Sequence, residues 1–260
     1  MLLFMYAPIA VLIVYSFNAS RSRSVWGGFT LDWYAQLLRD KSIQRALSTT
    51  LSLAFLSALL ATIIGAAAAV GIHSMRGAFK KTVLAVTNIP VIMPDIVMGL
   101  SLLVLYTYLF HFFPGIKLGY GTLLVSHTTF NIPYVILSVL PKLKQLDPNL
   151  YEAALDLGCT PIKGFFKVVL QEITSAIVTG AMLAFTMSLD DFIVSYFTKG
   201  DGDNTLSTII YSMARRGVNP KINALSAIMF VAVLLLLYVI NSFDPSKAQK
   251  ANGLGLEGES

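Results

Sequence analysis

The sequence predicts an all-α integral membrane protein with six transmembrane helices, and three observations lead to that fold class. Hydrophobic residues make up 55% of the 260 residues and charged residues only 13%, whereas average soluble chains carry about 25% charged residues. The mean hydropathy is +0.70. Six long apolar stretches are separated by short polar gaps. This composition leaves too little polar surface for an ordinary soluble enzyme, and it excludes a disordered or coiled-coil chain.

The six stretches justify the predicted spans in chain order. The first, from about Leu2 to Phe17, has no basic segment before it and no small-residue cleavage site after it, so we interpret it as a retained span rather than a signal peptide. In lipid each stretch must be a helix, because a lone strand leaves backbone groups unsatisfied. Long apolar runs also exclude the alternating strands of a β-barrel. The other five stretches lie at about 47–72, 83–110, 121–140, 173–197 and 222–240.

Two of the stretches carry signals about packing and shape. In the second, the small residues Ala61, Gly65 and Ala69 recur at four-residue spacing, which favours close helix packing in lipid. In the third, Pro90 and Pro94 remove helical hydrogen bonds. We therefore expect the second span to be a packing surface and the third to be a broken helix.

Several functions are disfavoured because their motifs are missing. The sequence has no G-x-x-x-x-G-K-[ST] phosphate loop, so we do not expect it to hydrolyse ATP alone. It has one cysteine, Cys159, no metal-ligand spacing and no nucleophile elbow, so we predict neither an enzyme nor a bound cofactor or metal. The net charge of +5 comes from Lys and Arg spread through the gaps, which argues against nucleic-acid binding. His127, in the fourth stretch, is expected to be an interhelical hydrogen-bond partner rather than a ligand.

Three acids lie at or near membrane depth. An ionisable group there costs about 2.5–3.5 kcal/mol, so its presence needs a reason. Asp95 adjoins the predicted helix break, and Asp190 and Asp191 end the fifth stretch. Successive helical residues point about 100° apart, so the pair cannot both face one groove. We expect one to line a pathway while the other caps a helix or pairs, with Lys199 or Arg215 as the candidate partners of Asp191.

Anionic side chains in this setting suit a cationic substrate. Aromatic residues can add cation–π contacts, although aromatics at span ends are more often interfacial anchors. An anionic substrate would favour Lys or Arg within the spans, and none is seen there. The aromatic candidates are Trp33, Tyr106 and Tyr196.

The gap after the fourth span predicts a short capped helix outside the membrane. Asp147 can cap it with Pro148 at the first helical position, and Gly158 can end it in a left-handed conformation. Thr160-Pro161 then opens a second helix by the same device. A rigid, protruding element of this kind suits docking to another protein. An ordinary inter-helix loop is the alternative.

The residues of this gap resemble the EAA loop of ABC importer permeases. Glu-Ala-Ala at 152–154 is followed by Gly158, and then by Val-Val-Leu-Gln at 168–171 where the family has Ile-x-Leu-Pro. Because this proline is missing, the sequence does not decide whether the chain bends where it enters the fifth span. In that family the EAA helix is cytoplasmic and sits in a groove of the ATPase, which implies that the gaps after spans two and four and both termini are inside. Lys and Arg divide almost evenly between the two sides and do not decide orientation. The implied docking residues are Glu152, Ala153, Ala154, Asp156 and Gly158.

Further short motifs, in order along nearly the whole chain, resemble the second permease subunit of spermidine/putrescine ABC importers. The resemblance implies a type I ABC importer permease fold in the bacterial cytoplasmic (inner) membrane. It also implies as partners an ATPase subunit dimer that uses ATP and Mg²⁺, a second, homologous permease and an extracytoplasmic polyamine-binding protein. The motifs are Tyr15-Ser-Phe-Asn-Ala-Ser20, Trp33-Tyr34, Met93-Pro-Asp-Ile96, Ser188-Leu-Asp-Asp191 and the segment from Gly217 to Leu225.

The predicted organisation is a first transmembrane helix and outer segment (1–46), a permease core (47–241) with the EAA loop at about 147–171, and a cytoplasmic tail (242–260) that we expect to be disordered.

Two alternatives stay open: an importer permease for another small solute, such as an iron chelate or inorganic anion, and an autonomous channel or secondary transporter. The latter predicts inverted repeats, and no convincing one is found. The sequence does not separate spermidine from putrescine. The candidate substrate-pathway residues are Asp95, Ser188, Asp190, Asp191 and Trp33.

Overall fold

The structure is a computed structural model that describes residues 2–20, 25–113, 115, 117–216 and 220–242. Within these ranges the regular structure is helical, apart from one isolated antiparallel bridge between Asn18 and Phe29. The predicted all-α fold class is confirmed. Of the predicted tail at 242–260, everything beyond Ser242 lies outside the described residues.

The helices account for all six predicted spans. Four helical segments are long and apolar enough to cross a membrane, namely α3, α5, α6 and the run from α8 to α9, and shorter apolar stretches lie in α1 and α12. The elements in order are α1 (Leu2–Tyr15), α2 (Asp32–Arg39), α3 (Lys41–Ser74), α4 (Gly77–Ile92), α5 (Asp95–Phe112), α6 (Tyr120–Gln145), α7 (Pro148–Asp156), α8 (Pro161–Gly164), the π-helical segment η1 (Phe165–Val169), α9 (Leu170–Asp190), α10 (Ile193–Thr198), α11 (Leu206–Arg215) and α12 (Pro220–Ser242).

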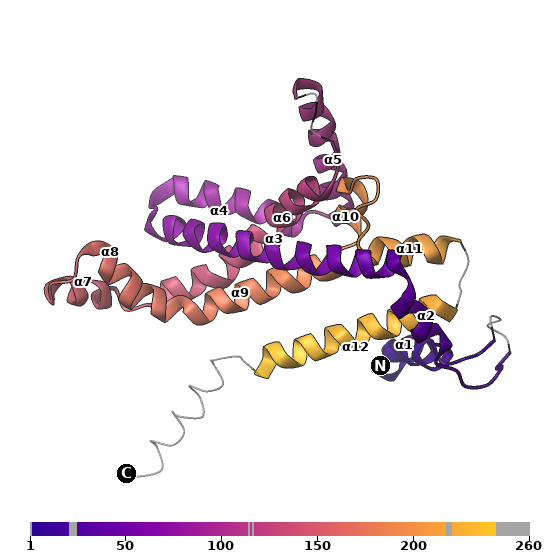
Figure 1. Cartoon of the computed structure of the whole chain (residues 1–260). Coiled ribbons are helices and arrows are strands. Elements are labelled where there is room, and N and C mark those ends of the chain that lie inside the picture. The colour runs from indigo at the N-terminus through magenta and orange to yellow at the C-terminus, as the bar shows by residue number, and fades with distance from the viewer. Residues whose placement is uncertain (1, 21–24, 114, 116, 217–219, 243–260) are drawn as a thin grey trace, which may run out of the picture.

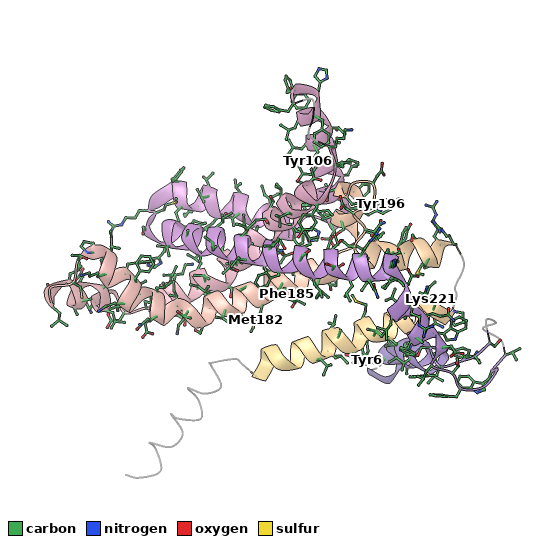
Figure 2. The ribbon with its side chains drawn as sticks, viewed as in Figure 1. Tyr6, Tyr106, Met182, Phe185, Tyr196 and Lys221 are labelled. Atoms are coloured by element: carbon green, nitrogen blue, oxygen red, sulfur yellow. The ribbon has the colours of Figure 1, made fainter. Side chains whose placement is uncertain are left out.

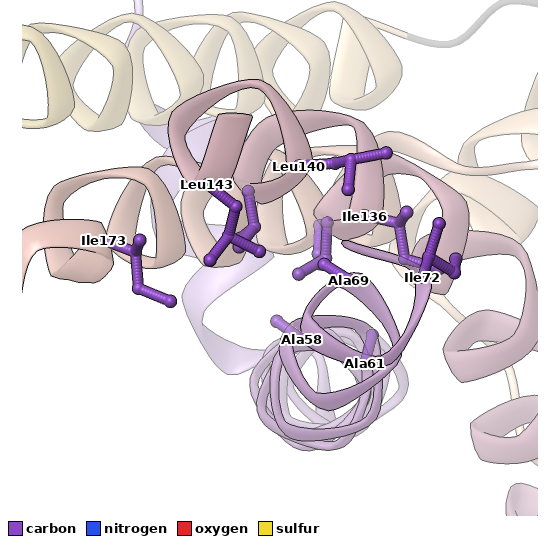
Figure 3. Close-up of a cluster of buried hydrophobic side chains, with 11 residues drawn as sticks. Ala58, Ala61, Ala69, Ile72, Ile136, Leu140, Leu143 and Ile173 are labelled. Atoms are coloured by element: carbon purple, nitrogen blue, oxygen red, sulfur yellow. The ribbon is translucent and has the colours of Figure 1, made fainter. Parts of the chain in front are cut away.

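The centre of the molecule is a bundle of α3, α6 and α9, which run side by side (Figure 1). The small residues of α3 face this core: Ala61 and Ala69 are fully buried (Figure 3). At Gly65 the backbone of α3 comes so close to α6 that a Cβ atom would lie 2.8 Å from the Cβ of Val135. The predicted packing surface is confirmed, since lipid-embedded helices approach closely where side chains are small.

The third span is broken, as predicted, but at one proline rather than two. Pro90 stays inside α4, whereas Met93 is extended (φ −71°, ψ 140°) and Pro94 precedes the first turn of α5. A proline disfavours helical backbone at the residue before it, which explains why the break falls at Met93. Figure 1 shows α5 leaving the bundle at a steep angle. Its Tyr106 hydroxyl lies 2.7 Å from Ser126 Oγ on α6, which ties α5 to the bundle (Figure 2).

The fifth span differs from the prediction at both ends. The helix runs continuously from Pro161 to Asp190 through η1. The absence of the family's proline at Gln171 explains why no break occurs there. At the other end, the apolar run to Phe197 that we predicted as one span divides at Asp191, and residues 193–198 form the separate helix α10.

A second buried cluster lies at the end of the bundle opposite α7 and α8, where α2, α3, α11 and α12 meet. It contains Trp33, whose indole N–H donates to the backbone oxygen of Asn18 at 2.8 Å. Beside it, Asp40 caps α3 by accepting from Ser42 N, and the same carboxylate pairs with Lys221 at the start of α12. These contacts fasten the first and last helices to the bundle.

Candidate functional site

A cavity of about 370 Å³ lies where the two helix breaks meet, and it contains all three predicted acids. Asp95 is the first residue of α5, Asp190 is the last residue of α9, and Asp191 lies in the break before α10. Asp95 and Asp190 are both exposed. The cavity is lined by Pro90, Asp95, Met98, Phe130, Tyr134, Met187, Asp190, Asp191, Phe192, Ile193 and Val194.

The prediction that the adjacent acids cannot both face one groove was wrong: both line the cavity, because Asp191 lies past the end of α9 with extended backbone (φ −59°, ψ 129°). The expectation that one of the pair caps a helix is met. The carboxylate of Asp191 caps α10: it accepts from Val194 N at 3.2 Å and from Ser195 N at 2.7 Å. Its oxygen Oδ2 also lies 3.5 Å from His127 Nε2. The salt bridges found among the described residues do not join Asp191 to either predicted partner, and Lys199 donates to Asn204 instead.

The lining of the cavity is anionic and partly aromatic. Lys and Arg are absent from the residues that line this cavity in the described part of the chain. Phe130, Tyr134 and Phe192 contribute aromatic rings to the same lining as the carboxylates, and the face of an aromatic ring attracts cations. Unneutralised carboxylates together with aromatic and methionine side chains can accommodate an organic cation with an apolar stem.

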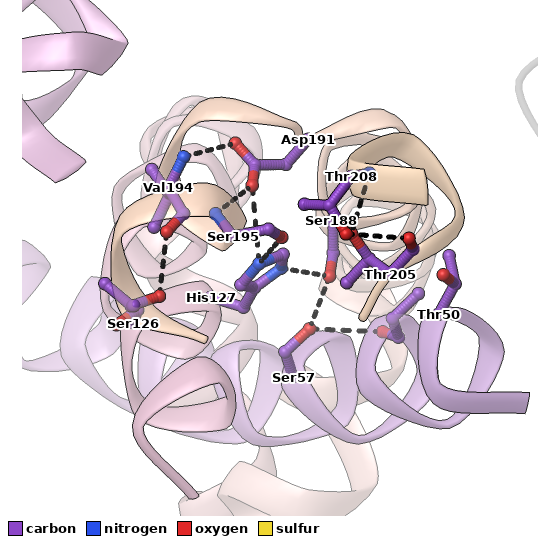
Figure 4. A network of polar contacts seen from close by, with 12 residues as sticks. Thr50, Ser57, Ser126, His127, Ser188, Asp191, Val194, Ser195, Thr205 and Thr208 are labelled. Carbon is purple, nitrogen blue, oxygen red and sulfur yellow. Dashed lines mark hydrogen bonds and ion pairs between the residues drawn. The ribbon is translucent and has the colours of Figure 1, made fainter. Parts of the chain in front are cut away.

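Behind this cavity a buried polar network joins four helices (Figure 4). The imidazole of His127 lies with Nδ1 at 2.7 Å from Ser188 Oγ and Nε2 at 2.9 Å from Ser195 Oγ. Ser57 on α3 donates to Ser188 Oγ at 3.0 Å. The prediction that His127 is an interhelical hydrogen-bond partner is confirmed.

Two predicted pathway residues lie elsewhere. Ser188 is buried behind the cavity wall in the network of His127, and it is not among the lining residues. Trp33 belongs to the buried cluster at the end of the bundle and is only 6% exposed. Sequence reasoning also missed Phe130 and Tyr134, which lie one helical turn apart on α6. The only available signal was their four-residue spacing, and an apolar run contains many such pairs.

The predicted capped helix is present as α7. Asp147 accepts from Asn149 N at 2.9 Å, and Pro148 begins the helix. At its end Gly158 has φ +84°, Gly158 N donates to Leu155 O, and Cys159 N donates to Ala154 O. This pair of bonds is the Schellman motif. One detail of the prediction was wrong: Thr160 precedes α8, but its side chain makes no capping bond, and Gly164 N donates to the Thr160 backbone oxygen.

Of the five predicted docking residues, two determine the shape of the element and three are exposed on its surface. Ala154 is buried and faces Gly164 of α8, where an added Cβ atom would lie 3.8 Å from the Ala154 Cβ, so it lies between α7 and α8. Glu152, Ala153 and Asp156 are exposed on the outside of the hairpin. Gly158 shapes the turn. The element formed by α7 and α8, which we call the coupling hairpin, projects at one end of the bundle (Figure 1).

A helical bundle with broken spans and a projecting capped hairpin defines a membrane transport component rather than an enzyme. Residues 61–245 match the family described as "Binding-protein-dependent transport system inner membrane component", and the chain belongs to that family. It is therefore a multi-pass permease subunit of an ABC transporter.

Two relatives and one solved structure show the range of similarity. The putrescine transport system permease protein PotI of Escherichia coli (strain K12) is 40% identical over 240 residues, which cover 91% of this chain and 85% of PotI. The spermidine/putrescine transport system permease protein PotC of the same strain is 40% identical over 234 residues, covering 90% and 87%. The solved structure is that of a bacterial ABC transporter involved in the import of alginate, and it matches with a TM-score of 0.71. The match covers 94% of this chain and 91% of the transporter chain at 18% sequence identity, so it supports the fold alone.

Proposed function

We propose that this chain is a permease subunit of an ATP-driven importer that moves polyamines, spermidine or putrescine, across the bacterial cytoplasmic membrane. The observation that carries the substrate class is the convergence of Asp95, Asp190 and Asp191 on one cavity whose lining, among the described residues, contains no Lys or Arg. A polyamine carries separated ammonium groups on an apolar stem, which matches carboxylates set among aromatic and methionine side chains. The names of the 40% identical relatives support the same class.

The proposal assigns a role to each acid. Asp95 and Asp190 are exposed in the cavity and contact the ammonium groups in transit. Asp191 contributes charge and also holds the start of α10 through two backbone hydrogen bonds. The site is weak, because a high-affinity site for a polycation here would trap it. The extracytoplasmic binding protein therefore supplies most of the affinity.

The proposal also assigns the partners. The coupling hairpin docks on a separate ATPase dimer, which binds the ATP and Mg²⁺, with Glu152, Ala153 and Asp156 as its exposed contact residues. A second, homologous permease completes the pathway, and a polyamine-binding protein delivers the substrate from outside. Affinity purification of the tagged chain in mild detergent should bring down the ATPase and the second permease, and the chain alone should show no ATPase activity. Robust ATP hydrolysis by the isolated chain would contradict this assignment.

Replacing the acids one at a time tests the pathway. Asn keeps the size of Asp and one acceptor oxygen but removes the charge. For Asp95→Asn and Asp190→Asn we expect uptake of labelled spermidine or putrescine to fall about tenfold, the effect of losing one charge-assisted contact. Asp191→Asn should lower both uptake and the amount of complex, because Asp191 accepts one backbone bond on each carboxylate oxygen and an amide has only one acceptor oxygen. The control is Asp201→Asn, an exposed acid outside the cavity.

The measurement is uptake by cells or proteoliposomes containing the complete importer, normalised to assembled complex. Wild-type uptake by all three variants would overturn the pathway assignment. Uptake that falls only in proportion to the amount of complex would assign the acids to folding instead.

A further inference from the structure

The buried network behind the cavity forms one continuous chain of polar contacts. Ser57 Oγ lies 3.0 Å from Ser188 Oγ and 3.3 Å from Ala54 O, and Ser188 Oγ lies 2.7 Å from His127 Nδ1. The other ring nitrogen, Nε2, lies 2.9 Å from Ser195 Oγ. The same ring nitrogen lies 3.5 Å from Asp191 Oδ2, and Ser195 N donates to that oxygen at 2.7 Å. The chain therefore starts on α3 and ends on an acid of the cavity.

The ring of His127 spans the helix break that shapes the cavity wall. Ser188 lies in the last turn of α9 and Ser195 in the first turn of α10, on either side of Asp191. His127 itself is fully buried on α6 and does not line the cavity (Figure 4). Because the two ring nitrogens sit at fixed separation, the ring fixes how far apart these two helix ends stand.

We infer that His127 is a positioning residue for substrate recognition: it holds Asp191 and the α9–α10 break in the geometry that presents the acid to the cavity. This inference rests on the proposed function for its substrate. A carboxylate in a low-dielectric site keeps a defined direction only if the groups that donate to it are themselves fixed. His127 supplies that fixing in two ways: it holds the side chain of Ser195, whose backbone N–H donates to Asp191, and its Nε2 lies 3.5 Å from Asp191 Oδ2.

Two amide substitutions separate the two ends of the ring. The amide of Asn in His127→Asn reaches the position of Nδ1 but not that of Nε2, so it loses Ser195. The amide nitrogen of Gln in His127→Gln reaches the position of Nε2 and keeps a donor to Ser195. We expect His127→Asn to raise the KM for polyamine uptake about tenfold, and His127→Gln to stay within about threefold of wild type. The matched control is Thr128→Val, a buried neighbour that bonds only to Leu124 O within its own helix.

The experiment measures uptake against polyamine concentration with the complete importer, normalised to assembled complex, for the single variants and for the double variant with Asp191→Asn. If His127 acts through Asp191, the double variant has the KM of Asp191→Asn alone, because the two changes break one chain. A wild-type KM for His127→Asn would overturn the inference. Additive effects in the double variant, or losses that follow the amount of complex, would also overturn it.

A readout that does not need transport keeps the inference separate from the proposed function. In a Cys159→Ser background, Met187→Cys places a thiol in the cavity, and a cationic thiol reagent should label it faster than a neutral reagent of similar size. His127→Asn should lower the ratio of the two rates, and His127→Gln should keep it. If the wild-type complex imports no polyamine, the proposed function fails and this ratio alone decides the inference. An unchanged ratio in His127→Asn would overturn it.

Discussion

The central bundle and the coupling hairpin each depend on a glycine, but for opposite reasons. At Gly65 in α3 the backbone is an ordinary helix, and the glycine is required because a Cβ atom would meet Val135 at 2.8 Å. At Gly158, after α7, a Cβ would meet nothing within 4 Å, yet φ is +84°, a conformation that L side chains rarely adopt. The bundle therefore constrains the space between helices, whereas the hairpin constrains the path of the backbone.

This difference matches what each region has to do. The bundle must hold two helix breaks against one cavity, so its helices are locked by close contact and by buried polar bonds such as those of His127. Under the docking proposal, the hairpin needs a fixed outline with its side chains free on the outside. Its helix α7 is accordingly fastened by the Asp147 cap and the Schellman motif, while Leu157 remains 87% exposed.

The largest effect expected from this comparison is at Gly65. Gly65→Val must push α3 away from α6, and overpacking of this kind costs about 1–3 kcal/mol. The matched control lies in the same helix: a Cβ atom at Gly71 would meet nothing within 4 Å, so Gly71→Val should be close to wild type. Thermal stability of the purified complex in detergent, followed by size-exclusion chromatography, measures both. Equal stability of the two variants would show that α3 and α6 do not approach as closely as described.

A smaller and more local effect is expected at Gly158. Gly158→Val strains a positive φ and should cost the hairpin about 1 kcal/mol or more, while leaving the bundle intact. Under the docking proposal, ATPase association and transport-coupled hydrolysis should fall although the permease stays folded. Asn tolerates the left-handed conformation, so Gly158→Asn is the control and should retain most coupling. Normal coupling in Gly158→Val at normal expression would contradict the docking assignment.

The comparison also explains which features could be predicted from the sequence. The caps of α7, the break at Met93-Pro94 and the acids were found because their signals are local: a proline after an acid, a glycine after a helix, a carboxylate in an apolar run. The end of the fifth span was missed because hydropathy continues to Phe197, and one acid within the run does not by itself indicate that it caps a new helix. Local signals thus define the hairpin better than the interior of the bundle.

Long-range contacts account for the remaining differences. In the sequence Trp33 lies in a polar gap, which suggested that it could contact the substrate. In the structure its indole N–H donates to the backbone oxygen of Asn18, and its ring packs into the buried cluster at the end of the bundle. The partners of His127 lie 61 and 68 residues away in the chain, and Ser57 lies 131 residues from Ser188. Such pairs leave no periodicity or spacing in the sequence, so only the fold identifies them.

The smallest expected effect concerns the caps that begin the two regions. Asp147 caps α7 alone, whereas Asp40 caps α3 and also binds Lys221 at the start of α12. The hydrogen bond from Lys221, together with those from the backbone at Ser42 and Ile43 and the charge of Lys221, holds the pKa of Asp40 below its usual 3.8, against the opposing effect of partial burial. A lowered folded-state pKa means that the stabilisation is present above the unfolded-state value and is lost as the pH falls through the folded-state value.

Asp40→Asn keeps a good N-cap but removes the charge, so it isolates the ion pair from the cap. We expect it to lower stability by about 0.5–1 kcal/mol at pH 7, a size typical of a partly exposed pair. The difference from wild type should shrink as the pH is lowered from 5 toward and below 3.8. Thermal unfolding of wild type and Asp40→Asn over this pH range measures the difference in their stability. The other carboxylates titrate in both proteins, so their contribution cancels in this difference. Because salt screens an exposed pair, 1 M salt should also reduce it. Equal stability of the two proteins at every pH would mean that Asp40 contributes through its cap alone, as Asp147 does in the hairpin.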